Sequence, residues 1–386
     1  MEVSVIMPCL NEEKTIGICI KKAFDYFKDE GIDGEVIVVD NGSTDNSANI
    51  ASSLDAKVVY QPVKGYGSAY LMGLEKANGE YIIMADADNT YDLQEIGRFL
   101  AYLRQGYEFC IGSRFKGKIL EGAMPWSHQY IGNPILTWIL NLFFGAKISD
   151  AHCGMRAVTK EAYKKMDLKT IGMEFASEMV IKALKTKLKI KEIPITYHPR
   201  QGESKLDSFR DGWRHLRFML LYSPTYLFLI PGMTMFFIGL VFLLILLPGP
   251  LKIGNLYFGA HYMVLGSLLA ILGFQIINLG LYAKSYSLTE HFEESDRFIE
   301  WFFGYFNLER GLIVGTLVTL FGLGINIYIL VRWILSNFGP LSEVQTGLVA
   351  LTFMVIGIQI IFSSFFLSIL GIKRRNIHAP LGHKEE

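Results

Sequence analysis

Cysteine is scarce in this chain, and the few cysteines show no pairing pattern. The 386 residues include four, and their spacing contains no Cys-x-x-Cys metal or redox motif. We therefore expect reduced thiols in or near the core, in a cytosolic compartment. They are Cys9, Cys19, Cys110 and Cys153.

Excess charge of either sign is also missing. Lys and Arg total 37, as do Asp and Glu, so the formal net charge is +0. This balance speaks against the broad basic surface of a nucleic-acid-binding protein, and we expect no nucleic-acid partner. The N-terminus lacks a basic region followed by an apolar signal segment, so we expect the first domain to stay in the cytosol.

Long apolar runs, by contrast, are abundant, but only in the second half of the chain. Four of them reach about 20 residues, the length that spans a bilayer. As buried helices of a soluble protein they would need a very large core to cover them. We therefore predict a transmembrane domain over 223–372, followed by a tail over 373–386. The four predicted spans are 225–247, 260–282, 311–333 and 346–372.

Basic residues are distributed unevenly among the loops between these spans. The 283–310 loop carries three Lys or Arg and residues 373–375 are all basic, whereas 248–259 carries one and 335–345 none. Arg332, at the edge of the third span, counts slightly against the pattern. Because cytoplasmic loops are enriched in Lys and Arg, we predict a multi-pass protein of the cell membrane with both chain ends in the cytoplasm.

A segment just ahead of the first span has the pattern of an amphipathic helix. Apolar residues recur there at three- and four-residue spacing, and arginines line another face. The apolar set is Leu206, Phe209, Trp213, Leu216 and Leu220, and the arginines are Arg210, Arg214 and Arg217. We predict an interfacial helix over 204–222 with its cations near lipid phosphates; the alternative is a helix packed on its own domain. The stretch Ile135–Phe144 is too short to span and is predicted to enter the same interface.

Residues 1–203 have the pattern of a separate α/β domain. Strand-like and helix-like segments alternate up to about residue 90, which predicts a mostly parallel sheet covered by helices on both faces. The predicted strands are Val3–Pro8, Glu35–Val39, Lys57–Tyr60 and Glu80–Ala85, and the predicted helices are Lys14–Phe27, Asp45–Ser53 and Tyr66–Ala77.

Two carboxylates follow the fourth predicted strand. Tyr81–Ala85 is an apolar run, and Asp86 and Asp88 come directly after it. Since side chains alternate along an extended chain, both carboxylates point to one face. Open α/β sheets bind ligands beyond the carboxyl ends of their strands. Hard oxygen ligands at that place suit Mg²⁺ or Mn²⁺ held jointly with a substrate diphosphate, although Asp-x-Asp is also common in turns.

Polar residues follow the other predicted strands as well. The first leads into Pro8–Glu13, and the second leads into Asp40. Ser43 or Thr44 would cap the next helix, but capping does not account for Asp40. The glycines of the Lys64–Gly67 loop allow either a close approach to a ligand or merely a turn.

The order and spacing of these motifs resemble one known family. Residues 3 to about 220 are similar to the family 2 glycosyltransferases, which have the Rossmann-like GT-A fold, and within them to the dolichyl-phosphate or polyprenyl-phosphate mannosyl- and glucosyltransferases. The resemblance is carried by Pro8-Cys-Leu-Asn-Glu-Glu, Val38-Val-Asp-Asn-Gly-Ser-Thr-Asp, Lys64-Gly-Tyr-Gly-Ser-Ala, Asp86-Ala-Asp, Gly112-Ser-Arg, Ser149-Asp-Ala-His-Cys-Gly-Met-Arg and Arg200-Gln-Gly-Glu-Ser-Lys.

This resemblance implies a nucleotide-diphosphate-sugar donor and a Mg²⁺ or Mn²⁺ cofactor. Asp40 resembles the residue that contacts the nucleobase and Glu12 one near the ribose, while Asp86 and Asp88 resemble the metal and diphosphate pair. A UDP-sugar is the favoured donor and GDP-mannose the alternative. The expected donor-binding residues are Pro8, Asn11, Glu12, Asp40, Lys64, Gly65, Asp86, Arg200 and Lys205.

The sequence departs from the family pattern at two places. Close mannosyltransferase relatives have Asp-Ala-Asp-x-Gln, whereas here Thr90 stands where the Gln would be. This leaves open whether a metal ligand comes from that position or from Asp92. Relatives also tend to have Arg or Lys in the segment after the Ser-Arg motif, where this chain offers only His128 as a cation.

A polyprenyl phosphate acceptor would not require the enzyme to deprotonate its nucleophile. Its phosphate oxygen is already anionic, so transfer needs positioning and leaving-group stabilisation more than a strong base. We expect a single displacement that inverts the anomeric carbon. Arg114 is expected to hold the acceptor phosphate, together with His128 and Ser204, and Asp150 to orient either the acceptor or Arg114. The expected catalytic residues are Asp86, Asp88, Arg114 and Asp150.

The sequence thus predicts a metal-dependent membrane glycosyltransferase that adds one glucose, mannose or N-acetylhexosamine to a dolichyl or undecaprenyl phosphate. One alternative is a processive polysaccharide synthase, but its Gln-x-x-Arg-Trp motif is absent; the helix that would carry it reads Gly212-Trp-Arg-His. Another is a non-catalytic membrane module or flippase partner, which the intact acidic pair disfavours. An oligomer is compatible with the sequence.

Overall fold

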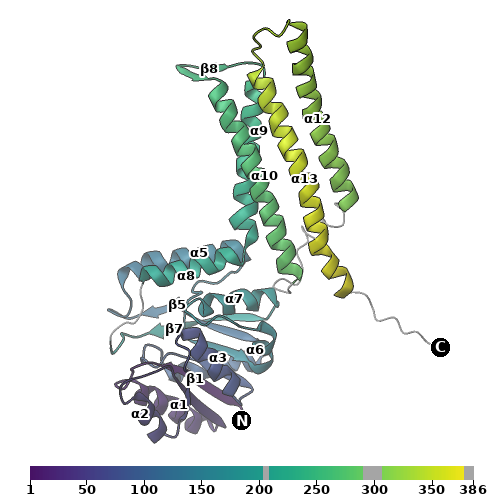
Figure 1. Ribbon diagram of the computed structural model, residues 1–386. Helices are drawn as coiled ribbons and strands as arrows, with labels where there is room; N and C mark the ends of the chain where they lie inside the picture. Colours follow the sequence, from purple (N-terminus) through teal and green to yellow (C-terminus); the bar gives the residue numbers. More distant parts are fainter. Residues whose placement is uncertain (203–207, 290–306, 378–386) are drawn as a thin grey trace, which may run out of the picture. The chain divides into compact units, whose positions relative to one another are not determined.

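The chain forms two compact units, Met1–Tyr222 and Ser223–Glu386 (Figure 1). The computed structural model describes residues 1–202, 208–289 and 307–377. The predicted fold class is confirmed, because the first unit is a mixed α/β domain and the second holds four helices of membrane-spanning length. The predicted domain boundary at residue 203 lies outside the described residues, as do Ser204 and Lys205.

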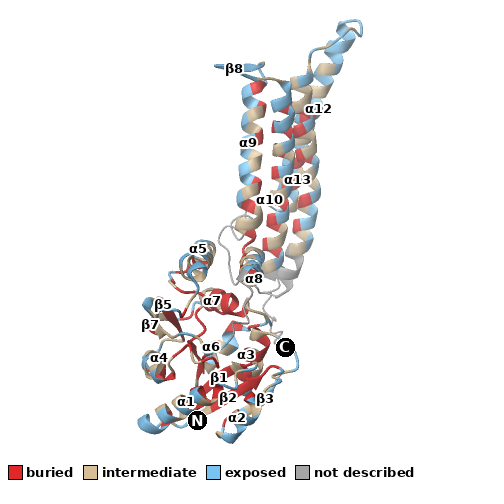
Figure 2. Cartoon of the chain, turned by 90° about the vertical axis from the view of Figure 1, so that its left-hand side faces the viewer, coloured by how far each residue is buried: buried red, intermediate tan, exposed pale blue. Residues whose placement is uncertain are grey.

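The first unit begins with the predicted alternation of strands and helices. Four strands pair in parallel, and residues of β1 and β2 are buried on both faces of the sheet (Figure 2). The strands are β1 (Val3–Cys9), β2 (Gly34–Asp40), β3 (Lys57–Tyr60) and β4 (Tyr81–Met84). The helices between them are α1 (Ile16–Glu30), α2 (Ser47–Ser53) and α3 (Tyr66–Lys76). All of them lie within three residues of the predicted bounds.

The sheet continues with three more strands, β5 (Phe109–Ile119), β6 (Arg156–Thr159) and β7 (Ile190–Tyr197). The strand order is β3-β2-β1-β4-β6-β5-β7. β6 runs antiparallel to both of its neighbours, so Arg156 at its start pairs with Met84 at the end of β4. The loop that leads into β6 therefore reaches the sheet edge to which Asp86 and Asp88 belong.

Helices and short turns complete this unit. They are η1 (Leu93–Glu95), α4 (Ile96–Arg104), η2 (His128–Gly132), α5 (Asn133–Phe144), α6 (Lys160–Met166), α7 (Phe175–Lys185) and α8 (Ser208–Leu221). The four cysteines are buried and free, as predicted. Burial raises the pKa of the Cys9 thiol to about 11 and that of Cys153 to about 12, so these thiols are inert at neutral pH.

Helix α8 has two apolar faces rather than the single one that we predicted. One face, which includes Phe218 and Met219, is buried within the first unit. The predicted face is the other one, where Phe209 is 88% exposed and Trp213 53% exposed. Neighbouring α5, which lies beside α8 (Figure 1), exposes Trp138 in the same way. The buried face fits the alternative of a helix packed on its own domain, and the placement of the exposed face in a membrane interface stays a prediction.

The second unit is built from η3 (Thr225–Leu229), α9 (Ile230–Leu246), α10 (Ala260–Thr289), α12 (Leu308–Leu335) and α13 (Val344–Ile377). A hairpin of β8 (Leu251–Ile253) and β9 (Leu256–Phe258) joins α9 to α10. The four apolar helices match the predicted spans to within three residues, except that α10 continues seven residues and α13 five residues beyond their predicted ends.

Helix pairs in this unit approach one another closely at glycines. A Cβ added at Gly239 of α9 would lie 2.3 Å from the backbone nitrogen of Ala270 on α10. A Cβ added at Gly315 of α12 would lie 2.9 Å from the carbonyl oxygen of Gly357 on α13. Small residues at such positions are typical of helices that associate in a bilayer, where close van der Waals packing replaces the hydrophobic effect.

Candidate active site

Asp86 stands two residues beyond the end of β4, facing two tyrosines of α3. Its Oδ1 accepts hydrogen bonds from the hydroxyls of Tyr66, at 3.2 Å, and Tyr70, at 3.4 Å. These tyrosines are one helical turn apart, so they present their hydroxyls to the same carboxylate. Withdrawal from water, followed by the like charge of Asp88, raises the pKa of Asp86 to about 7. The carboxylate pair therefore holds negative charge that the surroundings only partly compensate.

Asp88 is held by the residue that breaks the family pattern. Its Oδ1 accepts from the backbone nitrogen of Thr90, at 3.1 Å, and from the Thr90 hydroxyl, at 2.6 Å. Thr90 thus orients the Asp88 carboxylate. Asp92, the other residue considered for a metal ligand, accepts from the backbone nitrogen of Gln94 and pairs with Lys22. The side chains of Thr90 and Asp92 are thus both engaged by protein partners.

Arg200 bridges the end of the first strand to the acidic pair. Its Nη2 lies 2.6 Å from Glu12 Oε1, and its Nη1 lies 3.3 Å from Asp88 Oδ2. Its Nε is buried and has no hydrogen-bond partner among the described residues. Residues 188 positions apart in sequence therefore meet at one place, with hydrogen-bonding capacity to spare.

The loops after β1 and β2 are tied together around Asn11. Its backbone nitrogen donates to Ser43 Oγ at 3.0 Å, and its Oδ1 accepts from the backbone nitrogen of Thr44 at 2.7 Å. Asp40 Oδ1 accepts from the backbone nitrogen of Ser43 at 3.1 Å. Pro8 lies within β1, just ahead of this cluster. The predicted nucleotide-binding loops are thus neighbours held by direct hydrogen bonds.

The glycine loop approaches protein backbone rather than open space. Gly65 has φ +147°, and a Cβ there would lie 2.2 Å from the carbonyl oxygen of Ile171. Its nitrogen donates to Asn41 Oδ1 at 2.7 Å. Both the left-handed backbone and the close approach require glycine at this position. Lys64, beside it, is exposed.

Arg114 and Asp150 form a buried ion pair. Arg114 Nε lies 2.6 Å from Asp150 Oδ2, and Nη2 lies 2.7 Å from Asp150 Oδ1. Burial lowers the pKa of the Arg114 guanidinium, but Asp150 outweighs it and holds the pKa well above the usual range. Of the two roles considered for Asp150, the structure supports the orientation of Arg114. The guanidinium carbon also lies 5.2 Å from the centre of the Tyr197 ring, which is a cation–π distance.

Tyr91 and Gly154 connect this ion pair to the acidic pair. The Tyr91 ring packs against Tyr197, with centroids 5.4 Å apart, and the Tyr91 hydroxyl accepts from the backbone nitrogen of Gly154 at 2.8 Å. A Cβ at Gly154 would lie 2.7 Å from Asp86 Oδ2. The loop before β6 can therefore pass Asp86 only because it has glycine there.

Several supporting residues were not predicted from the sequence. Glu192 of β7 accepts from the backbone nitrogens of Ser149 and Asp150, at 2.8 and 3.1 Å, and so fixes the turn that carries Asp150. The tyrosines of α3 could have been found from their spacing of four residues in the helix that follows the glycine loop. Glu192 carries no local signal, because its partners lie more than 40 positions away.

A third group of buried polar residues links α8 to the loop before β6. His152 Nε2 lies 3.2 Å from Ser177 Oγ, which lies 2.8 Å from His215 Nδ1. The two imidazole rings meet edge to face, with centroids 4.5 Å apart. Burial lowers the pKa of both, that of His215 to about 4. These contacts tie α8 to the loop before β6 within the first unit.

Three predicted site residues are not among the contacts described above. His128 begins η2, just before α5, in the segment after β5. Ser204 and Lys205 lie outside the described residues. The contacts thus bring together Glu12, Asp88 and Arg200 in one cluster and Arg114 with Asp150 in another. Asp86 belongs with the first cluster through its charge interactions with Asp88 and Arg200.

The donor set suits a divalent cation only if a substrate completes it. Among the described residues no three His, Cys, Asp or Glu side chains form a metal-binding group. Mg²⁺ and Mn²⁺ are commonly bound through one or two carboxylates, with phosphate oxygens and water as further ligands. Asp86 and Asp88 fit such a shared site, because burial and, after it, the like charge of Asp88 raise the pKa of Asp86, and a bound cation would offset the negative charge of the pair.

Comparison with known proteins places both halves of the chain. The family model "Glycosyl transferase family 2" matches residues 4–167, and "Glycosyltransferase family 2 C-terminal transmembrane region" matches 281–371. The low-salt glycan biosynthesis hexosyltransferase Agl6 of Haloferax volcanii is 44% identical over 369 residues, which cover 95% of this chain and 89% of the relative. A dolichyl-phosphate hexose transferase of the same organism is 31% identical over 55% of this chain and 89% of its own length. Among solved structures, the glucosyl-3-phosphoglycerate synthase of Mycobacterium tuberculosis has a TM-score of 0.48 and 21% identity, covering 57% of this chain and 79% of that chain.

Proposed function

Because this chain belongs to glycosyltransferase family 2 and is a membrane glycosyltransferase, we propose that it moves one sugar from a nucleoside-diphosphate donor to a polyprenyl phosphate. In the reaction the bond between the anomeric carbon and the donor diphosphate breaks, a bond from that carbon to the acceptor phosphate oxygen forms, and the nucleoside diphosphate leaves. A single displacement of this kind inverts the configuration at the anomeric carbon.

One observation carries the donor half of this proposal, namely that Arg200 contacts both Glu12 and Asp88. The three side chains come from the loops after β1 and β4 and from the segment after β7. A guanidinium that rests between two carboxylates can exchange one of them for a diphosphate, to which it donates paired hydrogen bonds. We assign the donor diphosphate to this cluster, with Glu12 toward the ribose and Asp40 toward the nucleobase.

The acidic pair has a separate task. Asp86 and Asp88 would hold Mg²⁺ or Mn²⁺ together with the diphosphate, and a cation there would offset the charge that develops on the leaving group. Tyr66, Tyr70 and Thr90 keep the two carboxylates in place through the hydrogen bonds described above. The donor is then positioned before the acceptor arrives, which lowers the entropic part of the barrier.

The acceptor half of the proposal rests on Arg114 and on the second unit, which we call the membrane unit because it holds the four apolar helices. Asp150 uses Nε and Nη2 of Arg114, which leaves Nη1 without a hydrogen-bond partner among the described residues. We propose that Nη1 receives the acceptor phosphate, while Asp150 fixes the plane of the guanidinium. A polyprenyl carrier is supported by the four apolar helices and by the name of the dolichyl-phosphate hexose transferase relative.

We place the catalytic unit and the C-terminus in the cytoplasm. The support is the Lys and Arg asymmetry of the loops and the even number of spans among the described residues. The exposed aromatic side chains of α8 and α5 are suited to an interfacial position beside the lipid acceptor.

An assay of the purified full chain with a panel of nucleotide sugars and a polyprenyl phosphate tests the proposal. We expect a UDP-sugar, or GDP-mannose in its place, to yield a lipid one hexose or N-acetylhexosamine heavier by mass spectrometry. Once the phosphate is a diester its nucleophilic oxygen is masked, so transfer should stop after one sugar. A ladder of increments would indicate a processive synthase, and no product with any donor would indicate a non-catalytic module.

A further inference from the structure

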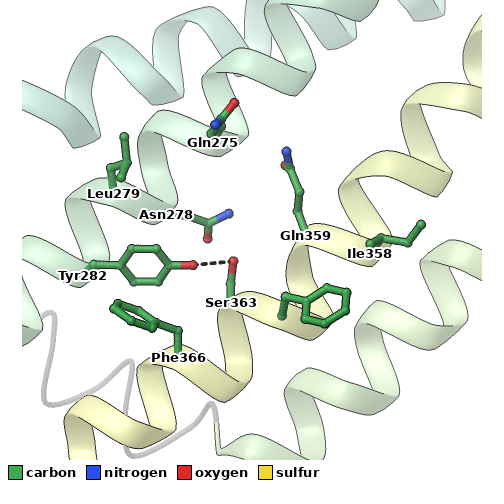
Figure 3. Close-up of a pocket in the computed structure, with 9 residues that line it drawn as sticks. Gln275, Asn278, Leu279, Tyr282, Ile358, Gln359, Ser363 and Phe366 are labelled. Carbon is green, nitrogen blue, oxygen red and sulfur yellow. Dashed lines mark hydrogen bonds between the residues drawn. The ribbon is translucent and has the colours of Figure 1, made fainter.

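Polar side chains gather inside the membrane unit, between α10 and α13 (Figure 3). They line a cavity of about 490 Å³, a size within the range of small-ligand pockets, about 300–1,000 Å³. The lining residues are Gln275, Asn278, Leu279, Tyr282, Ile358, Gln359, Phe362, Ser363 and Phe366. Five of these nine carry an amide or hydroxyl group, although both helices are apolar enough overall to cross a membrane.

Two hydrogen bonds fix the helices on either side of the cavity. Ser267 Oγ lies 2.7 Å from Thr352 Oγ1, and the Tyr282 hydroxyl donates to Ser363 Oγ at 2.7 Å. The sequence separations of 85 and 81 residues show that α10 and α13 run in the same direction. Each bond joins side chains that have a partner. The amide side chains between them have no hydrogen-bond partner in the part of the chain that the structure describes.

Three carboxamides of the cavity have unused hydrogen-bonding groups. Gln359 Oε1 is buried and has no partner within the described chain. Asn278, only 8% exposed, and Gln275 make no hydrogen bond to another described residue. In Figure 3 the Asn278 and Gln359 side chains both extend into the space between the two helices. Polar groups in hydrocarbon are costly unless something satisfies them, so residues of this kind mark functional sites.

The chemistry of the lining selects among the parts of a lipid-linked sugar. Among the described residues that line the cavity none is charged, whereas tight phosphate binding normally uses Arg or Lys. An isoprenoid chain would gain nothing from three amides. Sugar hydroxyls both donate and accept, as carboxamides do, and the rings of Tyr282, Phe362 and Phe366 offer apolar surface to the carbon face of a sugar.

We propose that this cavity binds the sugar head of a glycosylated membrane lipid, entering from the bilayer. The inference rests on the proposed function, since such a lipid is the product of the reaction assigned to the first unit. At 1.5 Å per residue, Tyr282 and Gln275 stand roughly 10 and 20 Å along the helix from the end of α10 at Thr289. Under the proposed topology this is the cytoplasmic half of the membrane. A sugar can reach that depth only where polar groups replace its water, and the three amides do so.

Photocrosslinking of the full chain in lipid nanodiscs tests this assignment. A photoreactive benzoylphenylalanine replaces Leu279, and the probe is a synthetic hexosyl polyprenyl phosphate with tritium in the sugar. A parallel sample receives tritiated polyprenyl phosphate without sugar. We expect the glycosylated lipid to label the α10 position about tenfold more strongly, the factor that one or two good hydrogen bonds supply.

Variants and a competitor identify the group that is recognised. Asn278→Leu and Gln359→Leu should each reduce labelling, with the initial rate of sugar transfer unchanged. The matched control is Asn326→Leu, which removes a membrane carboxamide that already has Gly322 O and Met354 Sδ as partners and does not line the cavity. In protein that keeps Asn278 and Gln359, octyl glucoside or octyl mannoside below its micellar concentration should compete with the labelled lipid for the cavity. A sugar-free octyl ether should not compete. The competition result stands even if a variant does not fold.

Three results would overturn the assignment. Equal labelling by the lipid without sugar would make the cavity a slot for the lipid chain. Crosslinked protein dimers in place of a lipid adduct would make it a contact with a second copy. If labelling of the protein with Asn278 were no stronger than labelling of Asn278→Leu, the cavity would be filled by water and not by the sugar. The proposed function fails separately, because in that case no donor yields product in the transfer assay while the synthetic lipid still labels the cavity.

Discussion

Arg114 and Asp150 form two parallel hydrogen bonds in the interior of the first unit, with side chains 8% and 0% exposed. The bonds join Nε to Oδ2 and Nη2 to Oδ1, so the carboxylate and the guanidinium lie in a paired, planar arrangement. Asp150 is held in turn by Glu192 through the backbone of the same turn. The position of Arg114 therefore depends on a chain of contacts that begins in β7.

Loss of Asp150 should destabilise the protein more than loss of an exposed ion pair. Asp150→Ala leaves the Arg114 charge buried without its partner, which typically costs about 3–5 kcal/mol. We expect a clearly lower Tm for the full chain in detergent, measured from its tryptophan fluorescence during heating. The matched control is Arg98→Ala, which breaks a surface pair with Glu95 and should cost no more than about 1 kcal/mol. Equal shifts in the two variants would contradict the assignment of Asp150 as the anchor of Arg114.

Asp88→Asn should leave the fold intact and remove most of the transfer activity. A neutral amide is a weak ligand for a hard cation and no longer pairs with the Arg200 charge, so we expect a loss on the order of 10²–10³ in kcat. Excess chelator should have a similar effect on the unsubstituted protein. Asp92→Asn is the control, since Asp92 caps η1 and contacts Lys22 and should retain activity. Full transfer in the presence of chelator would remove the metal from the mechanism.

Acid should destabilise the protein through the buried histidines. Burial lowers the pKa of His152 and brings that of His215 to about 4, whereas an unfolded chain has His at about 6.5. Between these values the unfolded state binds a proton that the folded state does not, so the stabilisation is complete above about 6.5 and is lost as the pH falls toward 4. For His215 this amounts to about 3 kcal/mol at 1.36 kcal/mol per pKa unit.

The measurement is the Tm of the full chain between pH 7.5 and 4.5. His215→Phe should flatten the decline, because it removes one of the groups that resist protonation. His261→Asn, which alters an exposed histidine at the start of α10, should leave the slope unchanged. If Tm fell equally with pH in the unsubstituted chain, in His215→Phe and in His261→Asn, the acid sensitivity would belong to other groups.

The first four strands and the acidic pair were predictable because their signals are local. The apolar run that forms β4 and the Asp86 and Asp88 that follow it are adjacent in sequence, and the order of strand and helix fixes which ends of the parallel strands meet. The same holds for the apolar spans, which depend only on length and composition. In each case the physical cause lies within one segment.

The second half of the sheet and the support of the site were not predictable in this way. The antiparallel direction of β6 brings Gly154 beside Asp86. No local sequence motif predicts the direction of a strand within a sheet. Arg114 and Asp150 are 36 residues apart, and Arg200 and Glu12 are 188 apart. Such pairings follow from tertiary packing, so a sequence pattern can propose each residue but not its partner. The buried second face of α8 has the same origin, since the periodicity showed only the exposed one.

Labelling from one side of sealed vesicles should settle the membrane topology. The four native cysteines are buried and free, so a cysteine introduced at an exposed position would dominate the reaction with a membrane-impermeant maleimide. Lys252→Cys, in the β8–β9 hairpin, and Ser342→Cys, between α12 and α13, should react only from the outside. Glu121→Cys, in the exposed turn after β5 of the catalytic unit, should react only from the cytoplasmic side. The expectation follows from the scarcity of Lys and Arg in the first two segments. If Lys252→Cys reacted from the same side as Glu121→Cys, α9 would not span the membrane and the catalytic unit could not be placed by the loop charges.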